Sequence, residues 1–169
     1  MIGDGLLPVD RFLATLQVVA KEAAHLEWSR ARLFEHQIDS SWVDALSTQP
    51  ERAERLEAFV SRYGRLQDTL VDKLLPRWLL ALAERPGSQI EVLNRAERLG
   101  VVESTIAMLE ARQLRNRVVH EYMADSAAFA EDLHLAEAYS RMLIETYRRI
   151  RDDAQTRMNL PADRLPKVW

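Results

Sequence analysis

The segment LRNRVVHEY, residues 114 to 122, groups side chains that can do chemistry. Arg115, Asn116, His120 and Tyr122 lie within eight positions of a stretch whose apolar spacing otherwise predicts a core helix. Histidine titrates near neutral pH and suits proton transfer, whereas arginine keeps its charge and its forked donors suit a site where negative charge builds up. The segment is therefore the first place to look for an active or binding site.

A helical wheel sharpens this expectation. With Arg115 at 0°, its neighbours within about 40° are apolar or aromatic, namely Met108, Ala111, Val119 and Tyr122. A second sector places Asn116 and His120 one turn apart, beside Ile106, Leu109 and Met123. Burying such polar groups without partners costs several kcal/mol, so we expect a partner group, water in a cleft or a ligand to satisfy them. Taken singly, a helical histidine is usually structural or at the surface, and an arginine in an apolar sector often snorkels or pairs with a carboxylate. Four such polar residues together make a functional site about as well supported as a structural role.

The elements that must carry these residues are helices. Apolar residues recur at spacings of three and four, and no long run alternates with period two. We expect long helices over about 9–36, 48–84, 102–123 and 126–158, with a short turn near 40–47 and a short helix from Ser88 to Gly100. Capping boxes are expected at Thr48 with Glu51, with Pro50 in the first turn, and at Ser88 with Glu91. Asp125 or Ser126 is expected to cap the last helix, and Pro76 to kink the second helix or break it near Leu75. The other glycines and prolines mainly mark the ends of helices and the loops between them.

These elements predict an all-α fold, an antiparallel four-helix bundle with an additional short helix, in a single domain over residues 1–169. Residues 158–169 are expected to form an irregular tail. The chain has 47% hydrophobic and 29% charged residues, a composition typical of globular proteins. Its net charge of -3 gives no general attraction to nucleic acid or anionic membranes, so any RNA contact needs a local basic patch.

Other sequence features bear on location and metals. There is no cysteine, which excludes disulfides, zinc–thiolate sites and thiol nucleophiles. The apolar stretch LLPVDRFLATLQVVA is too short to span a bilayer and lacks signal-peptide features, so we expect a cytoplasmic protein with no membrane partner. Two Glu-x-x-His pairs resemble di-iron ligands, but both fall roughly 110° to 170° from the apolar stripe of their helix. These pairs, Glu22 with His25 and Glu131 with His134, therefore indicate solvated charges, and we expect neither metal nor cofactor.

The motif also carries a family resemblance. Arg115, four intervening residues, His120, one residue and Tyr122 resemble the Arg-x4-6-His motif with trailing x-Tyr of the HEPN superfamily, in which an asparagine commonly follows the arginine, as Asn116 does here. The segment is especially similar to HepT-like toxins and to nucleotidyltransferase substrate-binding proteins. The helical bundle, the late position of the motif and a second helix of the FVSRYGRLQDTLVDKLLP type extend the resemblance.

The resemblance implies a function. HEPN ribonucleases cleave RNA without metal as homodimers whose arginines and histidines face each other across a cleft. By this resemblance Arg115, Asn116 and His120 are catalytic. Arg112 is expected to add positive charge near the RNA-binding cleft, with an ordinary surface arginine as the alternative. Tyr122 aligns with the tyrosine that a partner nucleotidyltransferase modifies to silence such toxins. Arg117 is instead expected to be a surface arginine paired with Glu110 or Glu121.

Three functions remain open from the sequence. The favoured one is a metal-independent endoribonuclease, the toxin of a pair with a minimal nucleotidyltransferase antitoxin. The alternative is a non-catalytic HEPN homodimer that binds a separately encoded nucleotidyltransferase. The third is a purely structural helical protein in which the motif closes a dimer interface.

Overall fold

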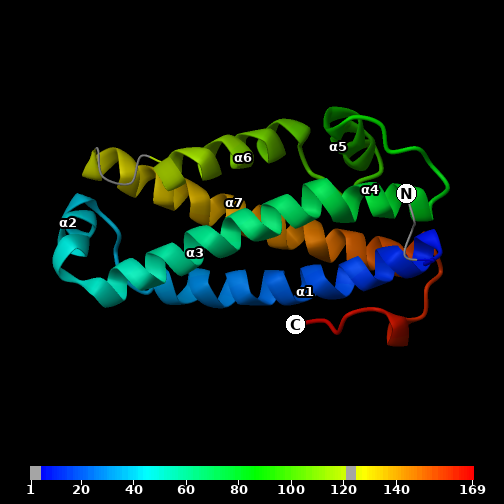
Figure 1. Ribbon diagram of the computed structural model, residues 1–169, viewed down its shortest axis with the longest axis horizontal. Coiled ribbons are helices and arrows are strands. Elements are labelled where there is room, and N and C mark those ends of the chain that lie inside the picture. The colour runs from blue at the N-terminus through cyan, green and yellow to red at the C-terminus, as the bar shows by residue number, and fades with distance from the viewer. Residues whose placement is uncertain (1–4, 121–124) are drawn as a thin grey trace. The chain divides into compact units, whose positions relative to one another are not determined.

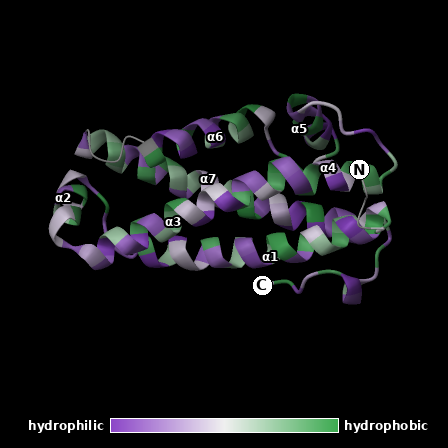
Figure 2. Cartoon of the chain, viewed as in Figure 1, coloured by the Kyte–Doolittle hydropathy of each residue, from purple (hydrophilic) through white to green (hydrophobic). Residues whose placement is uncertain are grey.

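The computed structural model describes residues 5–120 and 125–169, and this part of the chain contains helices and no strand. The predicted all-α fold class is therefore confirmed. The helices labelled in Figure 1 are α1 (Pro8–Leu33), α2 (Ser40–Asp44), α3 (Pro50–Thr69), α4 (Leu75–Ala81), α5 (Gln89–Arg98), α6 (Thr105–His120) and α7 (Ser126–Thr156). Figure 2 shows apolar residues recurring between polar ones along the long helices, which is the amphipathic pattern behind the prediction.

Several helix ends follow from local capping. Ser88 and Glu91 form the predicted capping box, with Glu91 N donating to Ser88 Oγ at 3.3 Å and Ser88 N donating to Glu91 Oε2 at 3.2 Å. Asp125 accepts from the backbone N–H groups of Ala127 and Ala128, both at 3.1 Å, and so starts α7 as predicted. Gly100 follows α5 with φ of +84°, a conformation that glycine adopts without strain.

The start of α3 corrects one prediction. Thr48 ends a 3-10 turn over Ala45–Thr48, and its hydroxyl donates to the carbonyl of Ala45 at 3.2 Å. The helix begins only at Pro50, so Gln49 directly precedes it and the Thr48–Glu51 capping box is wrong. The physical reason is that the 3-10 turn extends through Thr48, so Gln49 and not Thr48 stands directly before the first helical residue. Pro50 at the first helical position agrees with the prediction.

The expected break before Pro76 takes the form of a change in hydrogen-bond register. A π-helical turn over Leu70–Leu74 follows α3, and α4 begins at Leu75. Proline lacks an N–H and crowds the preceding turn, and a wider turn can absorb that mismatch. Beyond α7, the described tail contains only a 3-10 turn at Ala162–Arg164 and is otherwise irregular, as predicted.

By their internal contacts the residues form two compact units. The motif unit comprises the described residues of 22–67 and 106–144, and the terminal unit comprises those of 1–21, 68–105 and 145–169. The single domain over 1–169 stays a prediction. No helix in the described ranges has both the length and the apolar character that crossing a bilayer requires.

The motif unit contains segments of α1, α3, α6 and α7 together with α2. Hydrogen bonds and ion pairs link each helix to the next in a closed order: Ser29 with Arg62, Tyr63 with Ala111, Arg117 with Asp132, and Glu137 with Arg30. Further pairs, such as Phe34 with Phe59 and Glu110 with Tyr139, show that residue numbers rise along one helix as they fall along its neighbour. The four segments therefore pack as antiparallel neighbours.

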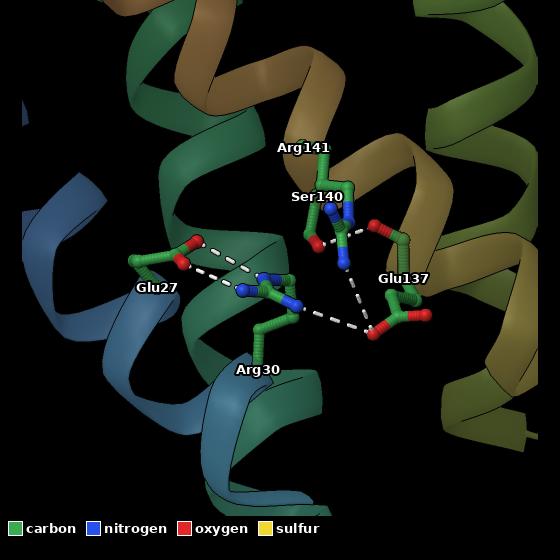
Figure 3. A network of polar contacts seen from close by, with 5 residues as sticks. All are labelled: Glu27, Arg30, Glu137, Ser140 and Arg141. Atoms are coloured by element: carbon green, nitrogen blue, oxygen red, sulfur yellow. Dashed lines mark hydrogen bonds and ion pairs between the residues drawn. The ribbon is translucent and has the colours of Figure 1, made fainter. Parts of the chain in front are cut away.

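A charged network joins α1 to α7 inside this unit, as Figure 3 shows. Arg30 donates from Nη2 and Nε to the two carboxylate oxygens of Glu27, at 2.6 and 3.0 Å, and from Nη1 to Glu137 at 3.3 Å. Arg141 approaches the same Glu137 carboxylate at 3.8 Å. The hydrogen bond to Glu27 is the largest cause of a raised pKa at Arg30. The network fixes the pairing of α1 with α7 on one side of the unit.

A buried carboxylate, Asp153, connects helices of the terminal unit through hydrogen bonds. Asp153 of α7 accepts from Trp78 Nε1 of α4 at 2.8 Å and from Arg157 Nε at 2.7 Å. Arg157 also donates to the carbonyl of Leu99 at 3.2 Å, which links α7 to the end of α5. Both oxygens of Asp153 are thereby paired, as a buried charge requires.

Candidate functional site

The structure places the described part of the predicted site on α6, in the motif unit. Arg112 and Arg115 are half-buried and Asn116 is exposed. His120 is the last residue of α6. The side chain of His120, and Tyr122 as a whole, lie outside the described residues.

The core face of α6 differs in part from the wheel. Its buried apolar residues are Met108, Ala111, Leu114 and Val118, so Arg115 lies at the edge of the apolar face. Val119 is 51% exposed and Ile106 is 69% exposed. Val119 was predicted beside Arg115, so the Arg115 sector is only partly buried. In the second sector Asn116 and Ile106 are exposed and Leu109 is half-buried, so its described residues face largely outward, which corrects that part of the prediction. Only one face of a helix can meet the core of its own unit, and here it is the face centred on Ala111.

Arg115 lies across a glycine of α3. A methyl group added at Gly64 would lie 2.9 Å from Arg115 Nε, 3.4 Å from its Cγ and 3.5 Å from its Cζ. Gly64 is buried, and a glycine inside a helix costs about 1 kcal/mol relative to alanine. Its missing side chain is the space that the arginine side chain uses.

The arginine borders a groove between α3 and α6. This groove, of about 370 Å³, is lined by Leu56, Glu57, Val60, Ser61 and Gly64 of α3 and by Arg115, Val118 and Val119 of α6. Hereafter it is called the Arg115 groove. Most of its wall is apolar, and its polar groups are the guanidinium, a carboxylate and a hydroxyl. A site of this size and mixture can hold a small ligand or part of a larger one.

Tyr63, next to Gly64, forms a hydrogen bond with the backbone of α6 one turn before Arg115. Its hydroxyl donates to the carbonyl of Ala111 at 2.8 Å. In a helix that carbonyl also accepts the N–H of Arg115, four residues later. Burial, the main cause, raises the pKa of the Tyr63 phenol, so the group remains a neutral donor throughout the ordinary pH range.

The other two arginines of α6, Arg112 and Arg117, differ in their contacts. Arg117, predicted as a surface arginine, has a side chain that is 42% exposed and pairs with Asp132 of α7, with Nη2 to Oδ1 at 3.2 Å. Glu110 instead accepts the hydroxyl of Tyr139 at 2.6 Å. Burial first, and then this bond to Glu110, raise the pKa of Tyr139 to about 12. Arg112 is half-buried on the same helix but does not line the Arg115 groove.

The two Glu-x-x-His pairs lie largely as their angles predicted. His25, Glu131 and His134 are exposed, whereas Glu22 is half-buried. His134 has a structural role, because its Nε2 lies 2.7 Å from the carbonyl oxygen of Ile38 and its ring contacts Phe34. The described residues hold no group of three or more histidine or acidic side chains placed to bind a metal ion.

Sequence reasoning missed the contribution of α3. Gly64, Tyr63 and the groove residues of that helix complete the surroundings of Arg115. One signal was available, because a glycine in the middle of a strongly helical segment often marks a close approach. Nothing in the sequence indicated that the approaching group would be Arg115, 51 positions later.

Comparisons with known proteins leave the family of the chain open. No protein-family model matches it, and no solved structure matches it. Over 77 residues the chain is 39% identical to a Rho guanine nucleotide exchange factor, gef3, of Schizosaccharomyces pombe (strain 972 / ATCC 24843). That match covers 44% of this chain and 13% of the yeast protein, so the chain spans only a small part of that relative's length.

Proposed function

We propose that the chain is a metal-independent endoribonuclease of the HEPN type, which acts as a homodimer and is the toxin of a pair with a minimal nucleotidyltransferase antitoxin. The observation that carries the proposal is the setting of Arg115. This cationic side chain lines an open groove, and the exposed Asn116 follows it on the helix that ends at His120.

The chemistry needs two proton transfers and one stabilised charge. Attack by the 2'-oxygen of RNA forms a new bond to phosphorus and breaks the bond from phosphorus to the 5'-oxygen of the next nucleotide. One histidine takes the proton of the 2'-hydroxyl and a second gives a proton to the departing 5'-oxygen. Arg115 stabilises the negative charge that builds on the phosphoryl oxygens, and Asn116 orients the phosphate or base. No cofactor is required.

The need for a second histidine leads to a dimer. The motif supplies one His120 per chain, so a pair of catalytic histidines requires two copies. Val119 and Ile106 are exposed apolar residues of the motif helix, and a second copy would remove them from water. The same dimer suits the alternative function, a non-catalytic module that binds a nucleotidyltransferase. A measurement of RNA cleavage distinguishes the nuclease from this module.

Paired arginine variants test the catalytic proposal. Arg115→Ala should lower RNA cleavage by about a hundredfold or more, because it removes a donor to the developing charge. Arg117→Ala removes an arginine two positions away whose partner is Asp132, and should leave cleavage within about threefold. The measurement is the rate of cleavage of single-stranded RNA in EDTA, with folding checked by circular dichroism. Equal rates for the two variants would contradict the catalytic role of Arg115.

A further inference from the structure

We propose that the Arg115 groove binds one nucleotide of single-stranded RNA, with its base against the apolar walls and its phosphate on Arg115. This inference rests on the proposed function, because it names how the RNA substrate enters the same site. It adds a binding and specificity role for α3, which carries none of the motif residues.

The walls of the groove suit a flat, apolar face. Leu56 and Val118 are buried beneath it, and Val60 of its α3 wall is half-buried. Bases of single-stranded RNA are recognised when they leave the stack and pack against protein side chains. A base placed here would cover apolar surface that the motif unit leaves in contact with water.

Arg115 supplies a positive charge that can bind the phosphate of the nucleotide. The side chain lies across Gly64, where an added methyl group would come within 2.9 Å of Nε. The glycine therefore sets the position of the guanidinium relative to the apolar wall. Arginine binds phosphate through its planar fork, so a cation beside an apolar slot matches a nucleotide better than an uncharged apolar ligand.

The size of the groove is also consistent with one nucleotide. Its α3 wall runs from Leu56 to Gly64, a span of nine residues and about 12 Å of helix. Its volume of about 370 Å³ falls at the lower end of the range of roughly 300–1,000 Å³ for small-molecule sites. A longer strand would have to continue over the surface beyond the groove.

The polar rim gives a preference among bases. Glu57 is exposed at the rim, and an ionised carboxylate accepts hydrogen bonds but cannot donate them. It therefore favours a base with an exocyclic amino group, as in adenine, cytosine or guanine, over uracil. Ser61 can donate or accept and does not discriminate in the same way.

A second groove in the motif unit provides the control. It lies between α1 and α3 and is lined by residues that include Trp28, Arg32, Ala58 and Arg62. Its lining carries two carboxylates, Glu51 and Glu54, beside its three arginines. Arg62 donates to Ser29 Oγ at 2.6 Å, and Arg32 lies over the Trp28 ring at 5.2 Å. Ala58 and Val60 are both half-buried on α3 but line different grooves.

The experiment measures binding of a 2'-O-methyl oligonucleotide, which lacks the attacking hydroxyl and so reports binding without cleavage. Val60→Trp fills the groove and Gly64→Ala displaces Arg115, so each should weaken the Kd at least about tenfold, which is about 1.4 kcal/mol. Ala58→Trp should stay within about twofold of wild type. Wild type should bind cytosine-rich strands more tightly than uracil-rich ones, and Glu57→Gln should reduce that difference.

The outcomes separate the inference from the proposed function. Binding that Val60→Trp and Gly64→Ala weaken, in a protein that cleaves no RNA, supports the nucleotide site and contradicts the nuclease. Cleavage by wild type with unchanged binding in both groove variants contradicts the nucleotide site and leaves the nuclease standing. Absence of binding by wild type, or equal weakening by Ala58→Trp, also overturns the inference. Circular dichroism checks that each variant is folded.

Discussion

At the scale of single residues, the motif helix and α3 depend on each other. Arg115 was predicted as a site residue from its type and spacing, because arginine, asparagine and histidine in one helix are chemically conspicuous. Tyr63 and Gly64 were not, because one is an ordinary buried aromatic and the other has no side chain. Their role follows only from packing, through the bond of Tyr63 to Ala111 and the contact of Gly64 with Arg115.

The Tyr63 phenol should make the free energy of unfolding decrease as pH rises above about 10. Its pKa is higher in the folded protein than the ordinary value of about 10, so both states hold the proton below pH 10 and the contribution to stability is then complete. As pH rises further, the unfolded chain loses the proton first and the free energy of unfolding falls, by up to about 1.4 kcal/mol per pH unit. Tyr63→Phe should make the fall between about pH 10 and 12 shallower in urea unfolding measurements. The same slope in both proteins would show that this phenol does not titrate differently on folding.

At the scale of elements, amphipathic periodicity and caps predicted most helices. The Ser88 box and the Asp125 cap were found because their bonds are local and depend on residues three or fewer positions apart. The start of α3 was missed because the preceding 3-10 turn extends through Thr48, so the helix begins only at Pro50. The outward face of Asn116 was missed because two apolar sectors of α6 looked alike, and only tertiary packing decides which one is buried.

Asp153 is the clearest test of packing between elements. Asp153→Ala leaves the buried Trp78 N–H without its acceptor and breaks the pair with Arg157, so we expect a loss of about 2–4 kcal/mol. Thermal unfolding followed by circular dichroism should show a Tm lower by roughly 5–15 °C. Asp152→Ala, at the exposed neighbouring position, is the matched control and should change Tm by less than about 2 °C. Equal shifts for both variants would mean that the Trp78–Asp153 bond does not stabilise the terminal unit.

At the scale of the whole molecule, the proposed nuclease requires two copies of the chain. The described monomer carries exposed apolar residues on the motif helix, and Val119 lies beside both Arg115 and the end of that helix. A dimer that joins two His120 residues would also bring these side chains toward the partner. The sequence could indicate this arrangement only through its resemblance to HEPN proteins, because a sequence pattern does not distinguish an interface from a core.

A charge at Val119 should therefore break the dimer. Val119→Glu places a carboxylate where the second copy is proposed to pack, at a cost of several kcal/mol if it is buried unpaired. Light scattering after size exclusion should give about 39 kDa for wild type, twice the chain mass of 19.5 kDa, and the monomer mass for the variant. Leu135→Glu, at a 41% exposed position of α7, is the control and should remain dimeric. A monomeric wild type at micromolar concentration would contradict the two-copy site.

The most direct test of the account is RNA cleavage by the purified protein in EDTA, with wild type and His120→Ala compared at the same concentration and oligomeric state. Mass spectrometry of the wild type first establishes that no nucleotide is attached to Tyr122. We expect cleavage by wild type and a loss of at least about a hundredfold in His120→Ala, because the variant lacks the group that transfers the protons. Absence of cleavage by unmodified, dimeric wild type would contradict the nuclease and leave the nucleotidyltransferase-binding module as the better proposal.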